Sequence, residues 1–154
     1  MDKAQLLRKI DRAWSEFRGS YAGLPDAALT EAGAVDDWSV KDIIGHVTTW
    51  EAEAVKYLPL IGAGETPPRY SVTYGGIDAF NALMTEEKRA LPVAELLGQQ
   101  EEVHARLLAI IEAAPDALLA RETRFRRRIR LDTYGHYPHH TAAIRTWRDG
   151  RAEG

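Results

Sequence analysis

The stretch DTYGHYPHH, residues 132–140, holds three of the five histidines in this chain. His136 and His140 are four residues apart, and on an α-helix such residues share a face with Cβ atoms about 5–6 Å apart. Two imidazoles at this separation can bind one metal ion through bonds of about 2.0–2.1 Å. The same face continues through Ile144 and Trp147, which should point into a core. The spacing therefore predicts a pair of metal ligands at a buried helix face.

Pro138 lies between these two histidines and bears on their geometry. A proline inside a helix removes one backbone hydrogen bond and clashes with the preceding turn, at a cost of about 3 kcal/mol. Either the helix begins near Gly135, so that Pro138 falls in the tolerant first turn, or it begins at Asp132 as N-cap and kinks at Pro138. In both cases we expect residues 136–140 to stay approximately helical. His139 points roughly 100° away from His140, and we assign it no role.

A third ligand should come from another helix, and His46 is the best candidate. It is aligned with Ile43 and Trp50 beside the apolar stripe of a predicted helix. His104 is the rival, because it lies within the apolar face of a further helix. The alternative for each is a core histidine with satisfied nitrogens. Glu53, seven residues after His46, could be a fourth ligand, a partner to a ligand or a general base, but we favour a solvated glutamate.

Helical periodicity runs through most of the chain. Apolar residues at spacings of three and four predict a first helix from Leu6 to Tyr21. Ser39 and Asp42 form a capping box that opens a second helix, which we expect to end at Pro59. Residues 61–76 should be irregular. Their length suits a crossover connection rather than a short turn between antiparallel neighbours.

The second half of the chain predicts two further main helices. Residues 76–91 are weakly helical, and Pro92 begins a stronger helix to residue 114 with Leu97, His104, Leu108 and Ile111 on one face. The basic segment 122–131 is expected to be a loop or an extended strip. Its arginines could bind an anion, but solvated charges or salt bridges to glutamates are the favoured explanation. The last helix should cover residues 132–147.

These elements predict an all-α fold. No segment alternates with a period of two, so strands are not expected. We predict one domain over residues 1–154, a four-helix bundle with a long crossover between its second and third main helices. The crossover and the helix after it carry Tyr70, Tyr74, Asp78 and Asn81. These side chains could cover a pocket, although packing on the bundle is the favoured interpretation.

The composition excludes several classes of site. The chain has no cysteine, so disulfides, thiolate metal ligands and a cysteine nucleophile are impossible, which fits a reducing compartment. Its net charge is -3, and nothing indicates a nucleic-acid partner or a membrane surface. The N-terminal stretch lacks the apolar core of a signal peptide, and no apolar run approaches the ~20 residues of a membrane span. We expect a cytoplasmic protein.

Two stretches resemble a known family. Residues 38–51 (WSVKDIIGHVTTWE) and 132–148 (DTYGHYPHHTAAIRTWR) resemble the second-helix and last-helix motifs of the DinB/YfiT-like superfamily. The resemblance implies a divalent metal site at His46, His136 and His140, and it suggests a homodimer. Residues 75–81 (GGIDAFN) and 133–140 look closer to the ClbS/DfsB-type branch. Members of that branch do not all keep the three histidines, and one is a hydrolase that opens a cyclopropane on a genotoxin.

Three functional hypotheses follow. The first is a metal-dependent hydrolase or thiol transferase acting on a small molecule. Zinc and nickel both suit imidazole ligands, three histidines leave coordination positions open, and metal-bound water can ionise near pH ~7. Any thiol must be an external low-molecular-weight thiol, as the resemblance to other superfamily members suggests. The second is a metal-independent ClbS-like hydrolase or a toxin-sequestering resistance protein. The third is a helical interaction module with vestigial histidines.

Overall fold

The computed structural model describes residues 1–153, and over this range regular structure consists of helices. The helices are α1 (Lys3–Tyr21), α2 (Asp26–Leu29), α3 (Val40–Gly62), α4 (Tyr70–Thr73), α5 (Ile77–Arg89), α6 (Val93–Ala113), α7 (Asp116–Leu119), α8 (Arg124–Asp132) and α9 (Tyr137–Glu153). In place of strands there is an isolated bridge between Val35 and Trp38. Within the described residues, no helix combines the length and the apolar character needed to cross a membrane.

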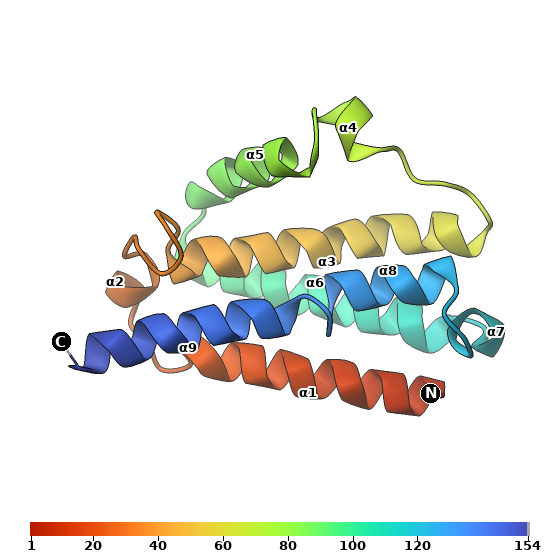
Figure 1. Ribbon diagram of the computed structural model, residues 1–154, viewed down its shortest axis with the longest axis horizontal. Coiled ribbons are helices and arrows are strands. Elements are labelled where there is room, and N and C mark those ends of the chain that lie inside the picture. Colours follow the sequence, from red (N-terminus) through yellow and green to blue (C-terminus); the bar gives the residue numbers. More distant parts are fainter. Residues whose placement is uncertain (154) are drawn as a thin grey trace.

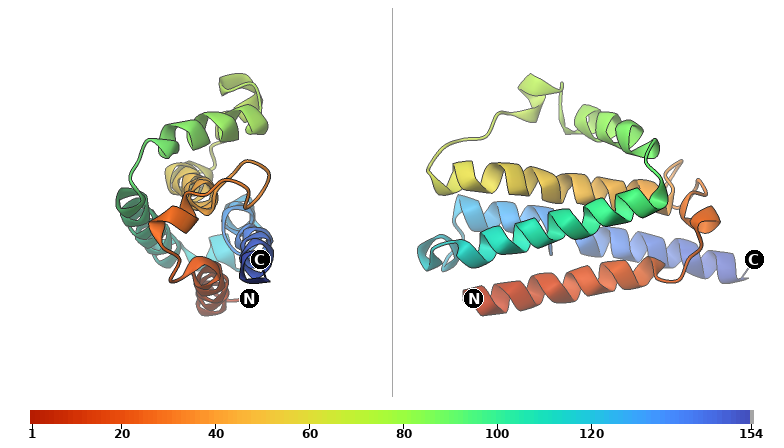
Figure 2. Two further views of the ribbon diagram at one scale, coloured as in Figure 1. Left: turned by 90° about the vertical axis from the view of Figure 1, so that its left-hand side faces the viewer. Right: turned by 180° about the vertical axis from the view of Figure 1, so that it is seen from behind.

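Four members form the bundle: α1, α3, α6 and a broken fourth member made of α8 followed by α9 (Figure 1). α3 packs against α6 and α8, while α1 packs against α9 and α6. The segment that carries α4 and α5 crosses outside the bundle, with α5 lying against α3 (Figures 1 and 2). The predicted all-α bundle with a long second connection is therefore confirmed, although the crossover contains one short helix, α4, that periodicity did not indicate.

The core is apolar and is built from one face of each member. Fully buried side chains come from α1 (Ile10, Phe17), α3 (Ile43, Ile44, Val47, Leu58), α6 (Leu107, Ile111) and α9 (Ile144). Burial of each such side chain contributes roughly 1.5–3 kcal/mol, which is what holds the four members together.

The start of α3 follows the prediction, but its end does not. Ser39 Oγ accepts a hydrogen bond from the Asp42 backbone N–H at 3.0 Å, and the Asp42 carboxylate accepts one from the Ser39 backbone N–H at 3.0 Å. The helix was expected to end at Pro59 but continues to Gly62. Proline removes only one backbone donor, and the buried side chains of Leu58 and Ile61 keep the last turn packed on the core.

The buried face of α6 also differs from the expected one. His104 and Ile111 are buried as predicted, but their neighbours on the buried stripe are Leu96, Gln100 and Leu107 rather than Leu97 and Leu108, which are half-buried. Adjacent leucines at 96–97 and 107–108 are one residue, or about 100°, apart on a helix. Periodicity alone therefore could not decide which leucine of each pair faces α3.

The basic segment was expected to be a loop or an extended strip, and that expectation is wrong. It forms α8, in which Thr123 caps the N-terminus by accepting a hydrogen bond from the Arg126 N–H at 3.1 Å. Phe125 and Ile129 are four residues apart and both buried. The arginines serve mainly as anchors: Arg124 donates to the Glu65 carbonyl, Arg126 to the Leu119 carbonyl, and Arg130 pairs with Glu122.

Candidate metal centre

His46 is placed by α3, two turns after the capped start of that helix. Its neighbour Val47 is fully buried in the core, whereas His46 itself is half-buried at the edge of the apolar stripe. The ring lies 5.2 Å from the Trp38 ring, centroid to centroid. The side chain is therefore held between the core and the surface and faces the junction of α8 and α9.

His136 is placed by the break in the fourth member of the bundle. α8 ends at Asp132, and the Gly135 N–H then donates to the Arg130 carbonyl at 2.8 Å. A Cβ on Gly135 would lie 2.6 Å from that carbonyl oxygen, so only glycine allows this close approach. The His136 N–H donates to the Thr133 carbonyl at 2.7 Å. This tight turn places His136 directly before Tyr137, the first residue of α9.

The start of α9 decides between the two positions considered for Pro138. The helix begins at Tyr137, so Pro138 lies in the first turn, where its missing N–H has no intrahelical partner to lose. The predicted start at Asp132 is wrong, because Asp132 is the last residue of α8. His140 then follows His136 by one turn, and the α9 helix continues beyond the predicted end at Trp147 to Glu153.

The three predicted histidines meet in space. The Nε2 atoms of His46 and His136 are 3.1 Å apart, and those of His140 and His136 are 2.9 Å apart. The three ring centroids are separated by 4.6–5.0 Å, with interplanar angles of 70°, 71° and 84°. These are the only His, Asp or Glu side chains in the described part of the chain whose ligand atoms form such a group.

This arrangement fits a divalent metal ion. Nitrogen ligands around one ion at ~2.0–2.1 Å lie about 2.9–3.4 Å from each other. His136 Nε2 lies within hydrogen-bond distance of both other Nε2 atoms, but a neutral ring nitrogen carries either one proton or one lone pair there. It can make one good hydrogen bond at most. A cation at the centre would satisfy all three lone pairs.

The electrostatics of the cluster also favour neutral imidazoles. Burial, and to a lesser extent the neighbouring histidines, lower the pKa of His46 to about 4 and the pKa values of His136 and His140 to about 3. Neutral rings keep the lone pairs that a metal needs. The other ring nitrogen of His136, Nδ1, is buried without a hydrogen-bond partner among the described residues.

His104, the alternative candidate for the third ligand, lies in the core and is not part of the histidine cluster. Its Nδ1 atom is 2.6 Å from Glu51 Oε1, and its ring stacks on Trp14 at 3.8 Å with an angle of 7°. Tyr137 also donates to Glu51 Oε1, at 2.8 Å. Burial raises the pKa of Glu51, while both hydrogen bonds oppose that shift. His104 is thus a core histidine, and the Glu51–Tyr137 bond ties α3 to the residue that follows His136.

Glu51 is the main residue that the sequence analysis missed near the cluster. A signal was present, because Glu51 lies four residues after Val47 and three before Ala54, on the buried stripe of α3. Glu53 instead is half-buried and accepts a hydrogen bond from the Tyr70 hydroxyl at 3.1 Å. It is neither a member of the histidine cluster nor a fully solvated side chain. His139 is exposed and does not join the cluster.

A cavity of about 400 Å³ adjoins the cluster. It is lined by His46 and His136 together with Trp50, Tyr70, Ile77, Asn81, Arg128, Leu131 and Asp132. Tyr70 and Asn81 were weighed as pocket residues, and both line this cavity, whereas Tyr74 and Asp78 do not. Arg128 was considered only as one of the arginines of the basic segment that could bind an anion, and Asp132 only as a helix cap. Neither was placed at the histidine site, since their side chains come together with the cluster only through the α8–α9 break.

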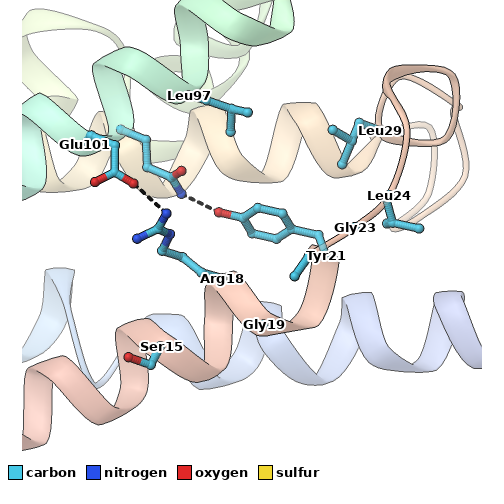
Figure 3. A pocket seen from close by; sticks show the side chains of 11 residues that line it. Ser15, Arg18, Gly19, Tyr21, Gly23, Leu24, Leu29, Leu97 and Glu101 are labelled. Carbon is cyan, nitrogen blue, oxygen red and sulfur yellow. Dashed lines mark hydrogen bonds and ion pairs between the residues drawn. The ribbon is translucent and has the colours of Figure 1, made fainter.

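A second cavity, of about 490 Å³, lies between α1 and α6 (Figure 3). Gln100 donates to the Tyr21 hydroxyl at 2.6 Å, and Arg18 pairs with Glu101 at 2.6 Å across it. No histidine lines it. The predicted metal ligands therefore adjoin the first cavity and not this one.

Comparisons with known proteins agree with this architecture. The sequence model described as the DinB superfamily matches residues 9–143. An uncharacterised protein from Escherichia coli UTI89 has a similar structure, with a TM-score of 0.83 at 19% identity over 98% of this chain and 95% of that one. A protein from Streptococcus pneumoniae has a TM-score of 0.79 at 14% identity, over 97% and 91% of the two chains. No curated protein matches. Because the family match spans most of the residues, including the whole histidine cluster, the chain belongs to the DinB superfamily.

Proposed function

We propose that His46, His136 and His140 bind one divalent metal ion, zinc or nickel, and that the protein is an enzyme that uses it to act on a small molecule by hydrolysis or by transfer of an external thiol. One observation carries the proposal: the Nε2 atoms of His46 and His140 lie 3.1 Å and 2.9 Å from His136 Nε2, beside a cavity. A metal held by three histidines keeps open positions and can activate water or a thiol.

The surrounding residues supply the other parts of such a site. His46 and His136 line the cavity, so a small molecule there would reach the ligand cluster. Asp132 also lines the cavity, and burial raises its pKa to about 6. A carboxylate with a pKa near neutrality is suited to exchange a proton with a bound substrate. Because the chain has no cysteine, the thiol route would need a thiol supplied as a second substrate.

The metal content of the untagged protein tests the proposal. Purified without chelators, it should contain close to one zinc or nickel per chain by elemental analysis. His46→Ala should lose that metal and remain folded, because His46 is half-buried beside the core rather than within it. His139→Ala is the matched control: it removes an exposed histidine next to His140 and should keep the metal.

A second measurement guards against adventitious binding. Zinc at a hundred times its Kd should raise the free energy of unfolding of the wild type by about 2.7 kcal/mol, and should not do so for His46→Ala. If neither variant nor wild type binds metal after reconstitution with divalent ions, the proposal is wrong. A metal-independent ClbS-like hydrolase or a toxin-sequestering protein would then be the function to test.

We also infer membership of the ClbS/DfsB-type branch and a homodimeric state. The branch is supported by the GGIDAFN stretch at residues 75–81 and by residues 133–140, and the dimer by the family resemblance. Sedimentation equilibrium of the purified protein would test the oligomeric state, and a monomer at micromolar concentration would refute it.

A further inference from the structure

The cavity beside the histidines has a polar wall with unused hydrogen-bond donors. Arg128 is half-buried there: its Nε donates to Asp132 Oδ2 at 2.6 Å and its Nη2 to the Tyr70 hydroxyl at 3.0 Å. These two bonds fix the planar guanidinium. The Nη1 edge has no partner within the described residues, and it is not among the atoms shielded from solvent.

Asn81 adds a second donor to the cavity lining. The Trp50 Nε1–H donates to Asn81 Oδ1 at 2.9 Å. Because an indole nitrogen can only donate, this bond also fixes which end of the amide is oxygen. Asn81 Nδ2, with two N–H groups, therefore faces away from Trp50 and has no partner within residues 1–153. Residues from two elements that line the cavity, Asn81 of α5 and Arg128 of α8, therefore each carry N–H groups without a hydrogen-bond partner in the described part of the chain.

The cavity lining also has an apolar part that is exposed to solvent. Ile77 at the start of α5 is 54% exposed and Leu131 near the end of α8 is 52% exposed. Single exposed apolar side chains are common on protein surfaces. Here, however, two of them come from different helices and line one cavity, together with the Trp50 ring. An apolar group seated there would remove both side chains from water.

We propose that this cavity binds a small organic acid, whose anionic group accepts hydrogen bonds from Arg128 Nη1 and Asn81 Nδ2 and whose apolar body covers Ile77 and Leu131. The volume of about 400 Å³ equals roughly a dozen water molecules at ~30 Å³ each, so the acid would have about ten to fifteen non-hydrogen atoms. Planar guanidinium groups suit carboxylates because they donate in a matching fork geometry.

Whether the cavity attracts an anion depends on the sum of the charges around it. Arg128 and Asp132 pair and nearly cancel, and Glu53 is turned to the Tyr70 hydroxyl. A divalent ion at the three neutral histidines would be the largest local charge and would make the cavity positive. To that extent the inference rests on the proposed function, but the donors of Arg128 and Asn81 are independent of the metal.

A pair of isosteric probes tests the inference. The acid 2-naphthoate and its neutral amide 2-naphthamide have the same size and the same apolar body, and they differ in charge at one end. Isothermal titration calorimetry should show the acid binding the zinc-loaded protein at least about tenfold more tightly than the amide, because only the acid is a charged acceptor. In metal-free protein the preference should persist at about threefold or more, since Arg128 remains.

Three variants locate the binding site. Leu131→Glu places a carboxylate at the apolar rim and should weaken naphthoate binding at least about fivefold by like-charge repulsion and lost apolar contact. Leu83→Glu is its matched control, because Leu83 is 46% exposed but does not line the cavity, and it should change the Kd less than twofold.

Removing Arg128 alone would leave Asp132 buried without its partner. The double variant Arg128→Gln with Asp132→Asn removes both charges and should abolish the acid preference of the metal-free protein.

The outcomes separate this inference from the proposed function. Equal affinities for acid and amide, absence of binding by both, or equal effects of the two leucine variants would overturn the inference. If zinc still binds in those cases, the metal proposal stands. Conversely, an acid preference in a protein that binds no metal, lost in the double variant, would support the organic-acid site and refute the metal enzyme.

Discussion

Gly135→Ala is the substitution with the clearest consequence for the histidine cluster. Gly135 lies in the turn between α8 and α9, directly before His136, and its N–H donates to the Arg130 carbonyl at 2.8 Å. An added Cβ would meet that carbonyl oxygen at 2.6 Å. Carbon and oxygen atoms in close backbone contact lie about 3.3–3.6 Å apart. The turn would therefore have to shift by roughly 0.7 Å.

The size of the effect follows from this shift. The lost Gly135 hydrogen bond costs about 0.5–1.5 kcal/mol, and forcing an extra carbon into a filled space costs about 1–3 kcal/mol. We expect the free energy of unfolding to fall by about 1.5–4.5 kcal/mol. Metal sites tolerate about 0.2 Å in ligand distance, so His136 would also be displaced beyond tolerance. Zinc affinity should fall at least about tenfold, as when the support of a ligand is removed.

Urea denaturation in the presence of chelator measures the stability, and competition with a coloured zinc chelator measures the affinity. Gly98→Ala is the control, because Gly98 lies inside α6 with open space around its Cβ position. Replacing it should stabilise the helix by about 0.5–1 kcal/mol and leave zinc binding unchanged. If Gly135→Ala is as stable as the wild type and binds zinc equally well, the close approach at Arg130 does not position His136 and the reasoning is wrong.

Three further predictions concern other contacts. Burial raises the pKa of Tyr21 to about 12 from 10.0. Between those pH values the unfolded chain loses a proton that the folded chain keeps, so wild-type stability should fall by up to about 2–3 kcal/mol. Chemical denaturation across this pH range should show a flatter profile for Tyr21→Phe. Ser39→Ala removes the cap bond to Asp42 and should cost about 1 kcal/mol in urea denaturation, with no loss contradicting the capping box. Tyr137→Phe removes one bond to Glu51 and should cost about 1 kcal/mol while elemental analysis still finds the metal; loss of metal would mean that this hydroxyl positions His136.

Local signals were enough to predict that α1 and α3 are helices and where α3 begins. The Ser39 capping box and the apolar spacing of α1 and α3 reappear in the structure. The signals for α8 were also local, namely Thr123 as a cap and Phe125 and Ile129 four residues apart. The run of arginines, however, favoured the prediction of a loop, because like charges on one helix repel each other. In the structure these arginines pair with carbonyls and carboxylates, which offsets that repulsion.

The candidate site was predictable in its ligands but not in its surroundings. A spacing of four residues shows that His136 and His140 share a helix face, and the family resemblance adds His46. Whether they meet depends on the α8–α9 turn, which rests on a backbone approach between Gly135 and Arg130. Similarly, the Glu51–Tyr137 bond joins residues 86 positions apart. Such contacts arise from the relative placement of helices, which sequence periodicity does not specify.

The position of α5 outside the bundle has a consequence for how the protein opens. Only Phe80 and Thr85 of α5 are buried, and the helix packs mainly on α3. The free energy that holds it in place is therefore a small part of the global stability, and its amides should exchange with solvent through local unfolding well before those of α3. Ile77 and Asn81 of α5 line the cavity, whereas His46 belongs to α3, His136 lies directly before α9 and His140 lies in its first turn. The cavity thus joins two cooperative units of unequal stability, so its wall can detach while the histidine cluster stays intact.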